Sequence, residues 1–173
     1  MSNVSKSAVV RIFLADFIAA DTAGKLNMIG GGLSVVGVQG TEAGPIAGNT
    51  APFGVVFSIA VARELYGEEC SAELVLEDST GRPVSLPTPD GKGEQVLRVA
   101  QNVTFEEPNF PPGARVPRGS MLARTQWVLM FPAGLTLTPG GVYRWRLKID
   151  HETRADWTEP FYVPAGPSPI VVG

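Results

Sequence analysis

The sequence has a single cysteine and a single histidine among its 173 residues. Cys70 has no partner for an internal disulfide bond, and one cysteine with one histidine cannot supply the ligands of the usual zinc sites. Charged residues are scarce, at 18%, and the net charge is −3. Residues of both signs are scattered along the chain. Nucleic-acid surfaces need clustered Lys and Arg, and no apolar run approaches the ~18 residues of a membrane span. We therefore expect neither nucleic acid nor a membrane as a partner.

Glycine and proline, by contrast, are abundant, with 20 and 15 residues. They lie between short apolar runs, which favours many tight turns over disorder. A chain of this length can bury roughly 70% of its unfolded surface, so it needs neither a disulfide nor a metal to fold. We predict one β-sandwich domain over residues 8–163, with an N-terminal arm over residues 1–7 and a C-terminal extension over residues 164–173.

The dominant periodicity of the apolar residues is two, which is the pattern of β-strands. It is clearest in residues 143–150, where aromatic and aliphatic residues alternate with Arg, Lys and Asp. Residues 126–131 are apolar on both faces, which indicates a central strand. The predicted strands are residues 9–14, 26–38, 53–62, 72–77, 97–105, 126–131, 143–150 and 157–163.

About eight short strands, each ended by turn residues, predict an all-β fold: an immunoglobulin-like antiparallel sandwich of about 7–9 strands. Residues 15–22 could form a helical turn. The Gly- and Pro-rich residues 39–52 and 107–119 are predicted as two long loops. Because loops carry function more often than strands do, we expect partner contacts in these loops and in the C-terminal extension.

Few side chains suggest catalysis. His151 could join Asp150 or Asp156 in the Ser-His-Asp triad of a hydrolase, but an exposed histidine in a turn is the favoured interpretation. Cys70 lies on an alternating run, which favours a buried, inert thiol over a nucleophile or ligand. Residues 30–32 are three glycines without a phosphate-loop pattern, and they indicate a bulge or a close backbone approach in a strand.

Acidic residues could form a calcium site if loops converged at one end of the sandwich. They lack the spacing of an EF-hand, so solvated carboxylates are the favoured interpretation. The candidates are Asp16, Asp21, Asp150, Glu152, Asp156 and Glu159. We assign no catalytic, cofactor-binding or metal-binding residue from the sequence.

Three tryptophans could form an aromatic platform for sugars. Trp127 and Trp145 lie on apolar faces of predicted strands, which favours core packing. Trp157 stands between Asp156 and Thr158, and it is the tryptophan that we expect to be exposed.

Four phrases occur in order along the chain: Leu14-Ala15-Asp16, residues 24–32 (GKLNMIGGG), residues 76–84 (LEDSTGRPV) and residues 139–150 (PGGVYRWRLKID). Together they resemble the pattern of an uncharacterised family of small β-sandwich proteins from actinobacteria and their tailed phages. The resemblance covers residues 9–163 and departs at His151, where the family has glycine. It implies a β-sandwich in a phage context and transfers no catalytic residue.

These observations predict a non-enzymatic structural or assembly protein of a tailed-bacteriophage virion, a minor capsid or decoration subunit. Its expected partners are the major capsid protein or other virion proteins, as a homo-oligomer or bound to the lattice. Its expected location is the virion, assembled in the host cytoplasm. Two alternatives stay open: a module on the tail that binds host glycans or surfaces through Trp157, and a cytoplasmic phage regulatory protein absent from the particle.

Overall fold

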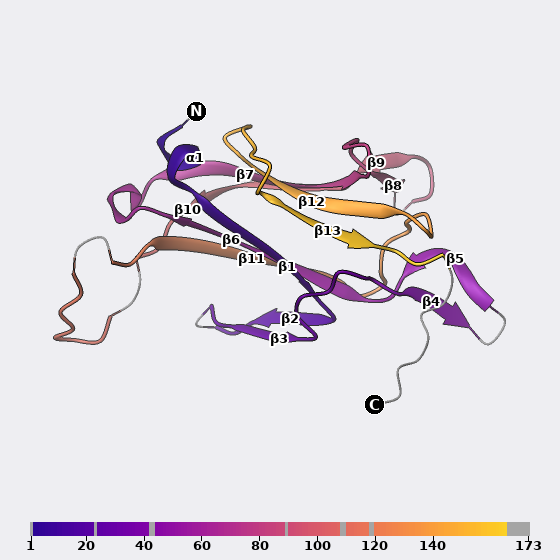
Figure 1. Ribbon diagram of the computed structural model, residues 1–173, viewed down its shortest axis with the longest axis horizontal. Coiled ribbons are helices and arrows are strands. Elements are labelled where there is room, and N and C mark those ends of the chain that lie inside the picture. Colours follow the sequence, from indigo (N-terminus) through magenta and orange to yellow (C-terminus); the bar gives the residue numbers. More distant parts are fainter. Residues whose placement is uncertain are drawn as a thin grey trace.

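Two antiparallel sheets form the body of the computed structural model, which describes residues 2–22, 24–41, 44–88, 90–107, 110–117 and 120–165 (Figure 1). The first sheet has the order β1-β6-β11, with β1 at Val9–Ala15, β6 at Phe53–Val61 and β11 at Ala123–Phe131. The second has the order β10-β7-β12-β13, with β7 at Glu69–Asp78, β10 at Arg98–Thr104, β12 at Val142–Ile149 and β13 at Thr158–Tyr162. Neighbouring strands in both sheets are antiparallel.

The chain passes between the sheets in the order of an immunoglobulin domain. β6 and β11 lie in one sheet, as strands B and E do, while β7, β12 and β13 lie in the other, as C, F and G do. β10 follows β7 and pairs with it, in the place of strand C′ of variable-type domains. The predicted all-β, immunoglobulin-like sandwich is confirmed.

Tyr143, at the start of β12, adds a second hallmark of this fold. Its hydroxyl oxygen accepts a hydrogen bond from the Thr138 backbone N–H at 2.9 Å and donates one to the Thr138 carbonyl oxygen at 3.3 Å. The tyrosine corner of immunoglobulin domains ties strand F to the backbone a few residues upstream in this way. The Tyr143 ring is buried, 5.8 Å from the Phe161 ring between centroids. The turn into β12 is therefore anchored to the core.

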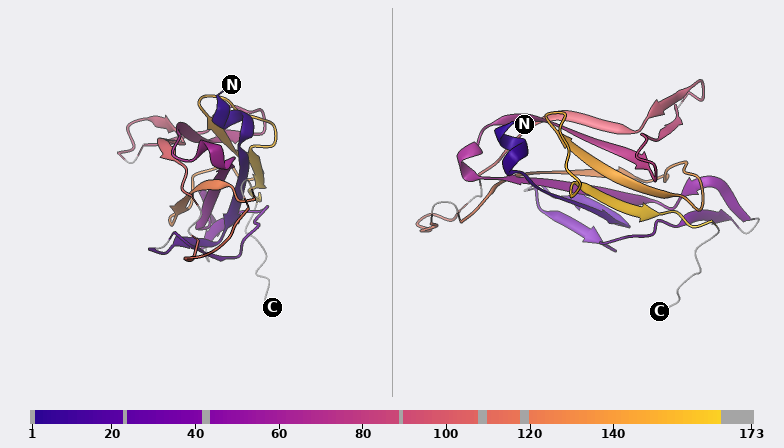
Figure 2. Two further views of the ribbon diagram at one scale, coloured as in Figure 1. Left: turned by 90° about the vertical axis from the view of Figure 1, so that its left-hand side faces the viewer. Right: turned by 45° about the horizontal axis from the view of Figure 1, so that its top comes forward.

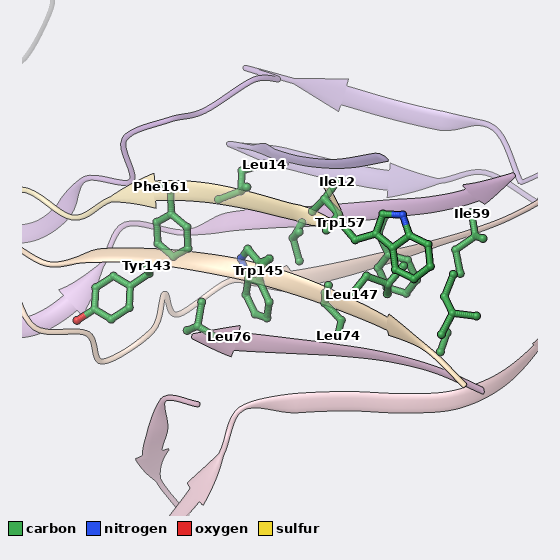
Figure 3. Packing of buried hydrophobic residues seen from close by; sticks show 14 of the residues in the cluster. Ile12, Leu14, Ile59, Leu74, Leu76, Tyr143, Trp145, Leu147, Trp157 and Phe161 are labelled. Carbon is green, nitrogen blue, oxygen red and sulfur yellow. The ribbon is translucent and has the colours of Figure 1, made fainter. Parts of the chain in front are cut away.

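The core lies between the two sheets and consists of alternate residues from each strand (Figure 3). On β12, the four apolar residues that the period of two placed on one face are all buried. Phe131 of the facing sheet stacks on Trp145 with the ring centroids 5.7 Å apart. Full burial of a large apolar side chain contributes about 1.5–3 kcal/mol, so these contacts hold the two sheets together.

Three two-stranded hairpins are attached to the sandwich, namely β2 (Phe17–Ala20) with β3 (Leu26–Ile29), β4 (Val38–Thr41) with β5 (Gly44–Thr50), and β8 (Ser85–Pro87) with β9 (Glu94–Val96). The β2–β3 hairpin packs on the first sheet, where Ile18 meets Ala15 and Val56 in a second, smaller apolar cluster. Figure 2 shows the β2–β3 and β8–β9 hairpins on opposite sides of the sandwich.

A short helix, α1 (Asn3–Ser7), occupies most of the predicted N-terminal arm. Its Val4 packs in the core cluster. The Arg154 guanidinium donates hydrogen bonds to the carbonyl oxygens of Ser5 and Ala8, each at 2.8 Å. One 3-10 turn (Arg63–Leu65) connects β6 to β7, and no helix of the described residues is long and apolar enough to span a membrane.

Two predicted elements near the N-terminus are wrong. Residues 15–22 contain β2 and no helical turn, because Ile18 is held in the apolar cluster under the hairpin. The strand predicted over residues 26–38 ends at Ile29. Gly30 and Gly32 adopt φ angles of 64° and 85°, which are incompatible with an extended strand. The Gly32 N–H then donates to the Leu14 carbonyl oxygen at 2.9 Å.

Two further predictions concern loops and strand order. Residues 39–52 are no long loop, since they contain most of the β4–β5 hairpin, whose register places Pro45 opposite Gly40. Proline is tolerated in such a two-stranded edge. Residues 126–131 belong to β11, an edge strand of its sheet and not a central one. Of the other predicted loop, residues 110–117 are described and contain neither helix nor strand. Residues 166–173 of the predicted C-terminal extension lie outside the described residues.

Candidate functional site

The structure does not assemble the side chains considered for catalysis. His151 is exposed in a two-residue turn with Asp150, and both residues have positive φ angles, 66° and 50°. The Asp150 carboxylate accepts a hydrogen bond from the Ser71 backbone N–H at 3.0 Å, which ties the turn to β7. The pair therefore shapes a tight hairpin turn of the primed type.

The acidic residues considered for calcium are dispersed. Asp21 accepts a hydrogen bond from the Lys25 N–H within the β2–β3 hairpin, and Glu152 accepts one from the Ser5 hydroxyl beside α1. Burial raises the pKa of Glu159, which lies on β13. Within the described residues, no three His, Cys, Asp or Glu side chains lie close enough to share a metal ion.

Gly30 makes the close backbone approach that was predicted for residues 30–32, although outside a strand. A β-carbon at Gly30 would lie 2.0 Å from the Asp16 carboxylate oxygen Oδ2. Only glycine fits this position, since the φ of 64° is also in the left-handed region. The contact fixes the end of the β2–β3 hairpin against the end of β1.

Cys70 is buried on β7, as its alternating pattern predicted. Burial, followed by the charges of Asp150 and Glu69, raises the pKa of its thiol to about 11. Because the thiolate is the reactive form, this thiol is unreactive at neutral pH.

Trp157 is buried, and its predicted exposure is wrong. It is 1% exposed, and the Arg154 guanidinium carbon lies 4.5 Å from the centroid of its ring. Trp145 is 0% exposed. A sugar platform centred on Trp157 is thus ruled out in this fold. The tryptophan that reaches the surface in part is Trp127 on β11, packed against Phe57 with the ring centroids 4.9 Å apart.

One side of the sandwich has its strand edges covered by other parts of the chain. On β1, the Leu14 carbonyl oxygen accepts hydrogen bonds from the N–H groups of Gly32 and Leu33. On β13, the backbone of Tyr162 bonds with residues 34 and 36, at 2.9 Å each. In the alternation of a strand, Pro160 occupies the next position that faces the same way, and it has no N–H to offer. Residues 32–36 thus cover the Leu14 end of β1 and the Tyr162 end of β13.

The opposite side differs, because the edge of β11 is open along most of its length. Arg124 exchanges backbone hydrogen bonds with Glu106 at 2.9 and 3.1 Å, on the side of β11 away from β6. Because backbone groups alternate along an antiparallel strand, those of Gln126, Val128 and Met130 also point away from β6. No backbone hydrogen bond from another described segment reaches these three residues.

A groove of about 430 Å³ runs beside this open edge. Val99 of β10 faces Trp127 and Leu129 of β11 along it, and Gln101 and Gln126 add polar groups. The far wall is the β2–β3 hairpin, through Ala20, Gly24 and Leu26. An open strand edge beside an apolar groove can add an extended chain, by main-chain hydrogen bonds and side-chain insertion.

The sequence predicted none of this edge as a site, although it contained a signal. Residues 125–131 carry no charge and are apolar on both faces from 127 onward. We interpreted that pattern as a strand buried between two neighbours, yet all five residues from 127 to 131 are only half-buried. The structure thus defines an immunoglobulin-like sandwich with an open edge along β11. No protein-family model matches the chain, and no curated protein is significantly similar to it.

Proposed function

We propose that this chain is a non-enzymatic structural protein of a tailed-bacteriophage virion, a minor capsid or decoration subunit that binds the major capsid protein or another virion protein. The phage context comes from the ordered phrases between residues 14 and 150. The observation that supports an assembly role is the presence of two apolar surfaces, one where β1 leads into the β2–β3 hairpin and one along the open edge of β11.

The first surface is the hairpin patch, which we define as Phe13, Phe17 and Ile29. These side chains are 43%, 47% and 67% exposed, and Phe17 lies opposite Ile29 across the β2–β3 pair. Burial of these side chains against a partner would be favourable by about 25 cal/mol per Å² of apolar surface. Exposed apolar clusters of this kind are typical of protein contact sites.

The second surface is the open edge of β11 with its groove. The residues of the open edge lie on β11, whereas those of the hairpin patch lie on β1, β2 and β3. A subunit that reinforces a lattice must contact more than one neighbour at once. A rigid sandwich with two apolar surfaces meets that requirement.

Quantitative mass spectrometry of purified particles tests the proposal by counting this chain against the major capsid protein. We expect a regular, lattice-like copy number. A variant with Phe17→Asp and Ile29→Lys should fold but fail to join the particle, whereas Tyr66→Asp, on a side chain that is 56% exposed, should join normally. Absence of the wild-type chain from particles would overturn the proposal and favour the cytoplasmic regulatory protein.

A further inference from the structure

We propose that β11 pairs with β11 of a second copy of this chain, antiparallel and across a two-fold axis. The two three-stranded sheets would then join into one six-stranded sheet. The pairing needs only the chain itself, so it holds or fails independently of the virion role.

The free backbone groups of β11 specify the register of this pair. The open window comprises Gln126, Val128 and Met130, because Glu106 occupies Arg124 at one end and Pro132 follows the strand at the other. A two-fold axis at Val128 places the two Val128 residues opposite each other and Gln126 opposite Met130 of the second copy. All three outward-facing residues of each copy are then paired, as in a regular antiparallel ladder.

The side chains of β11 support a partner that resembles β11 itself. Residues 127 to 131 are all apolar and all half-buried, which is the pattern of a strand with a neighbour on each side. In this register Trp127 lies beside Leu129 of the second copy, a pairing that covers the apolar floor of the groove. Exposed edges are normally guarded by Lys, Pro or a bulge, and residues 125–131 contain no charge and no proline.

Charge does not oppose this self-pairing. Arg124 is the single charged residue of β11, and the register sets it opposite Pro132 of the second copy. The two Arg124 positions are eight residues apart along the paired strands, about 27 Å at the rise of an antiparallel strand. That distance exceeds the Debye length of about 8 Å at physiological salt.

A charge-swap experiment on the full chain tests the register. The variant with Gln126→Lys and Met130→Lys places like charges opposite each other twice per dimer. The variant with Gln126→Glu and Met130→Lys places opposite charges there, and both share the same change at the buried side of β11. We expect the wild type to be a dimer by sedimentation equilibrium. The dissociation constant of the first variant should be at least about 30-fold higher than that of the second. This difference should shrink in high salt.

Cysteine cross-linking in a Cys70→Ser background gives an independent reading. Val128→Cys should form a disulfide-linked dimer on oxidation, since paired residues of this type have Cα atoms about 5.5 Å apart. Arg124→Cys, the matched control on the same strand, should not. A wild-type chain that stays monomeric at about 100 μM, where even weak dimers form, would overturn the pairing. Equal dimer strength in both charge variants would overturn it too. Loss of the dimer on deletion of residues 166–173 would assign the contact to that segment and overturn it also.

Discussion

Replacing Tyr143 with Phe removes one hydroxyl group while the aromatic ring stays in the core. That hydroxyl makes two hydrogen bonds with the Thr138 backbone, at 2.9 and 3.3 Å, and Tyr143 is only 7% exposed. A typical hydrogen bond contributes about 0.5–1.5 kcal/mol net. Thr138 is exposed, so water can replace part of the lost bonding. We expect the free energy of unfolding to fall by about 1–2 kcal/mol.

Urea denaturation followed by tryptophan fluorescence measures this loss, and thermal unfolding should show a Tm lower by about 2–8 °C. The matched control is Tyr66→Phe, which removes the same hydroxyl from a side chain that is 56% exposed. The control should change the free energy of unfolding by less than about 0.5 kcal/mol. Equal, small changes in both variants would refute the role of the Tyr143 hydroxyl as an anchor of the turn.

Two substitutions and one labelling experiment test other parts of the fold. His151→Gly should raise the free energy of unfolding by about 0.5–1 kcal/mol in the same assay, because a residue other than glycine pays for a φ of 66°; a loss of stability would contradict the strained turn. Arg146→Ala should lower the free energy of unfolding by about 2–3 kcal/mol. The reason is that Arg146 Nε donates hydrogen bonds to both oxygens of the nearly buried Glu77 carboxylate, at 2.8 and 2.9 Å. A loss below about 0.5 kcal/mol would show that this pair contributes no more than an ordinary surface pair. Burial raises the pKa of Cys70 from 9.0 to about 11, so its contribution to stability is complete below pH 9 and is lost as the pH rises toward 11. A thiol reagent at pH 8 should therefore label Cys70 only in the unfolded chain, and rapid labelling of the native protein would refute its burial.

The sequence pattern predicted strands well where one face alone is apolar. In β12 the alternation has one solution, because a shift by one residue would expose every apolar side chain. In β11 the same reasoning predicted the strand correctly but placed it in the centre of its sheet, whereas it lies at the edge. A run that is apolar on both faces indicates two neighbours, but it does not say whether the second neighbour belongs to the same chain.

Tertiary contacts decided the features that local patterns misplaced. Trp157 stands between polar residues, yet its ring packs in the main apolar core, with Arg154 lying over it from the preceding turn. The apolar residues 26–38 predict a strand that continues past Gly30. In the structure it ends before Gly30, where the backbone approaches Asp16 too closely for a side chain. Both outcomes depend on residues that no period along the chain connects.

The bond between Arg154 and the carbonyl oxygen of Ser5 joins residues that are 149 positions apart. A ribosome that adds about 5–20 residues per second needs roughly 7–30 s to make the intervening chain. During that time α1 lacks its hydrogen bond from Arg154. Val4 likewise lacks the core residues that the later strands contribute. The contact between α1 and the last connection of the sandwich can therefore form only after nearly the whole chain has been made.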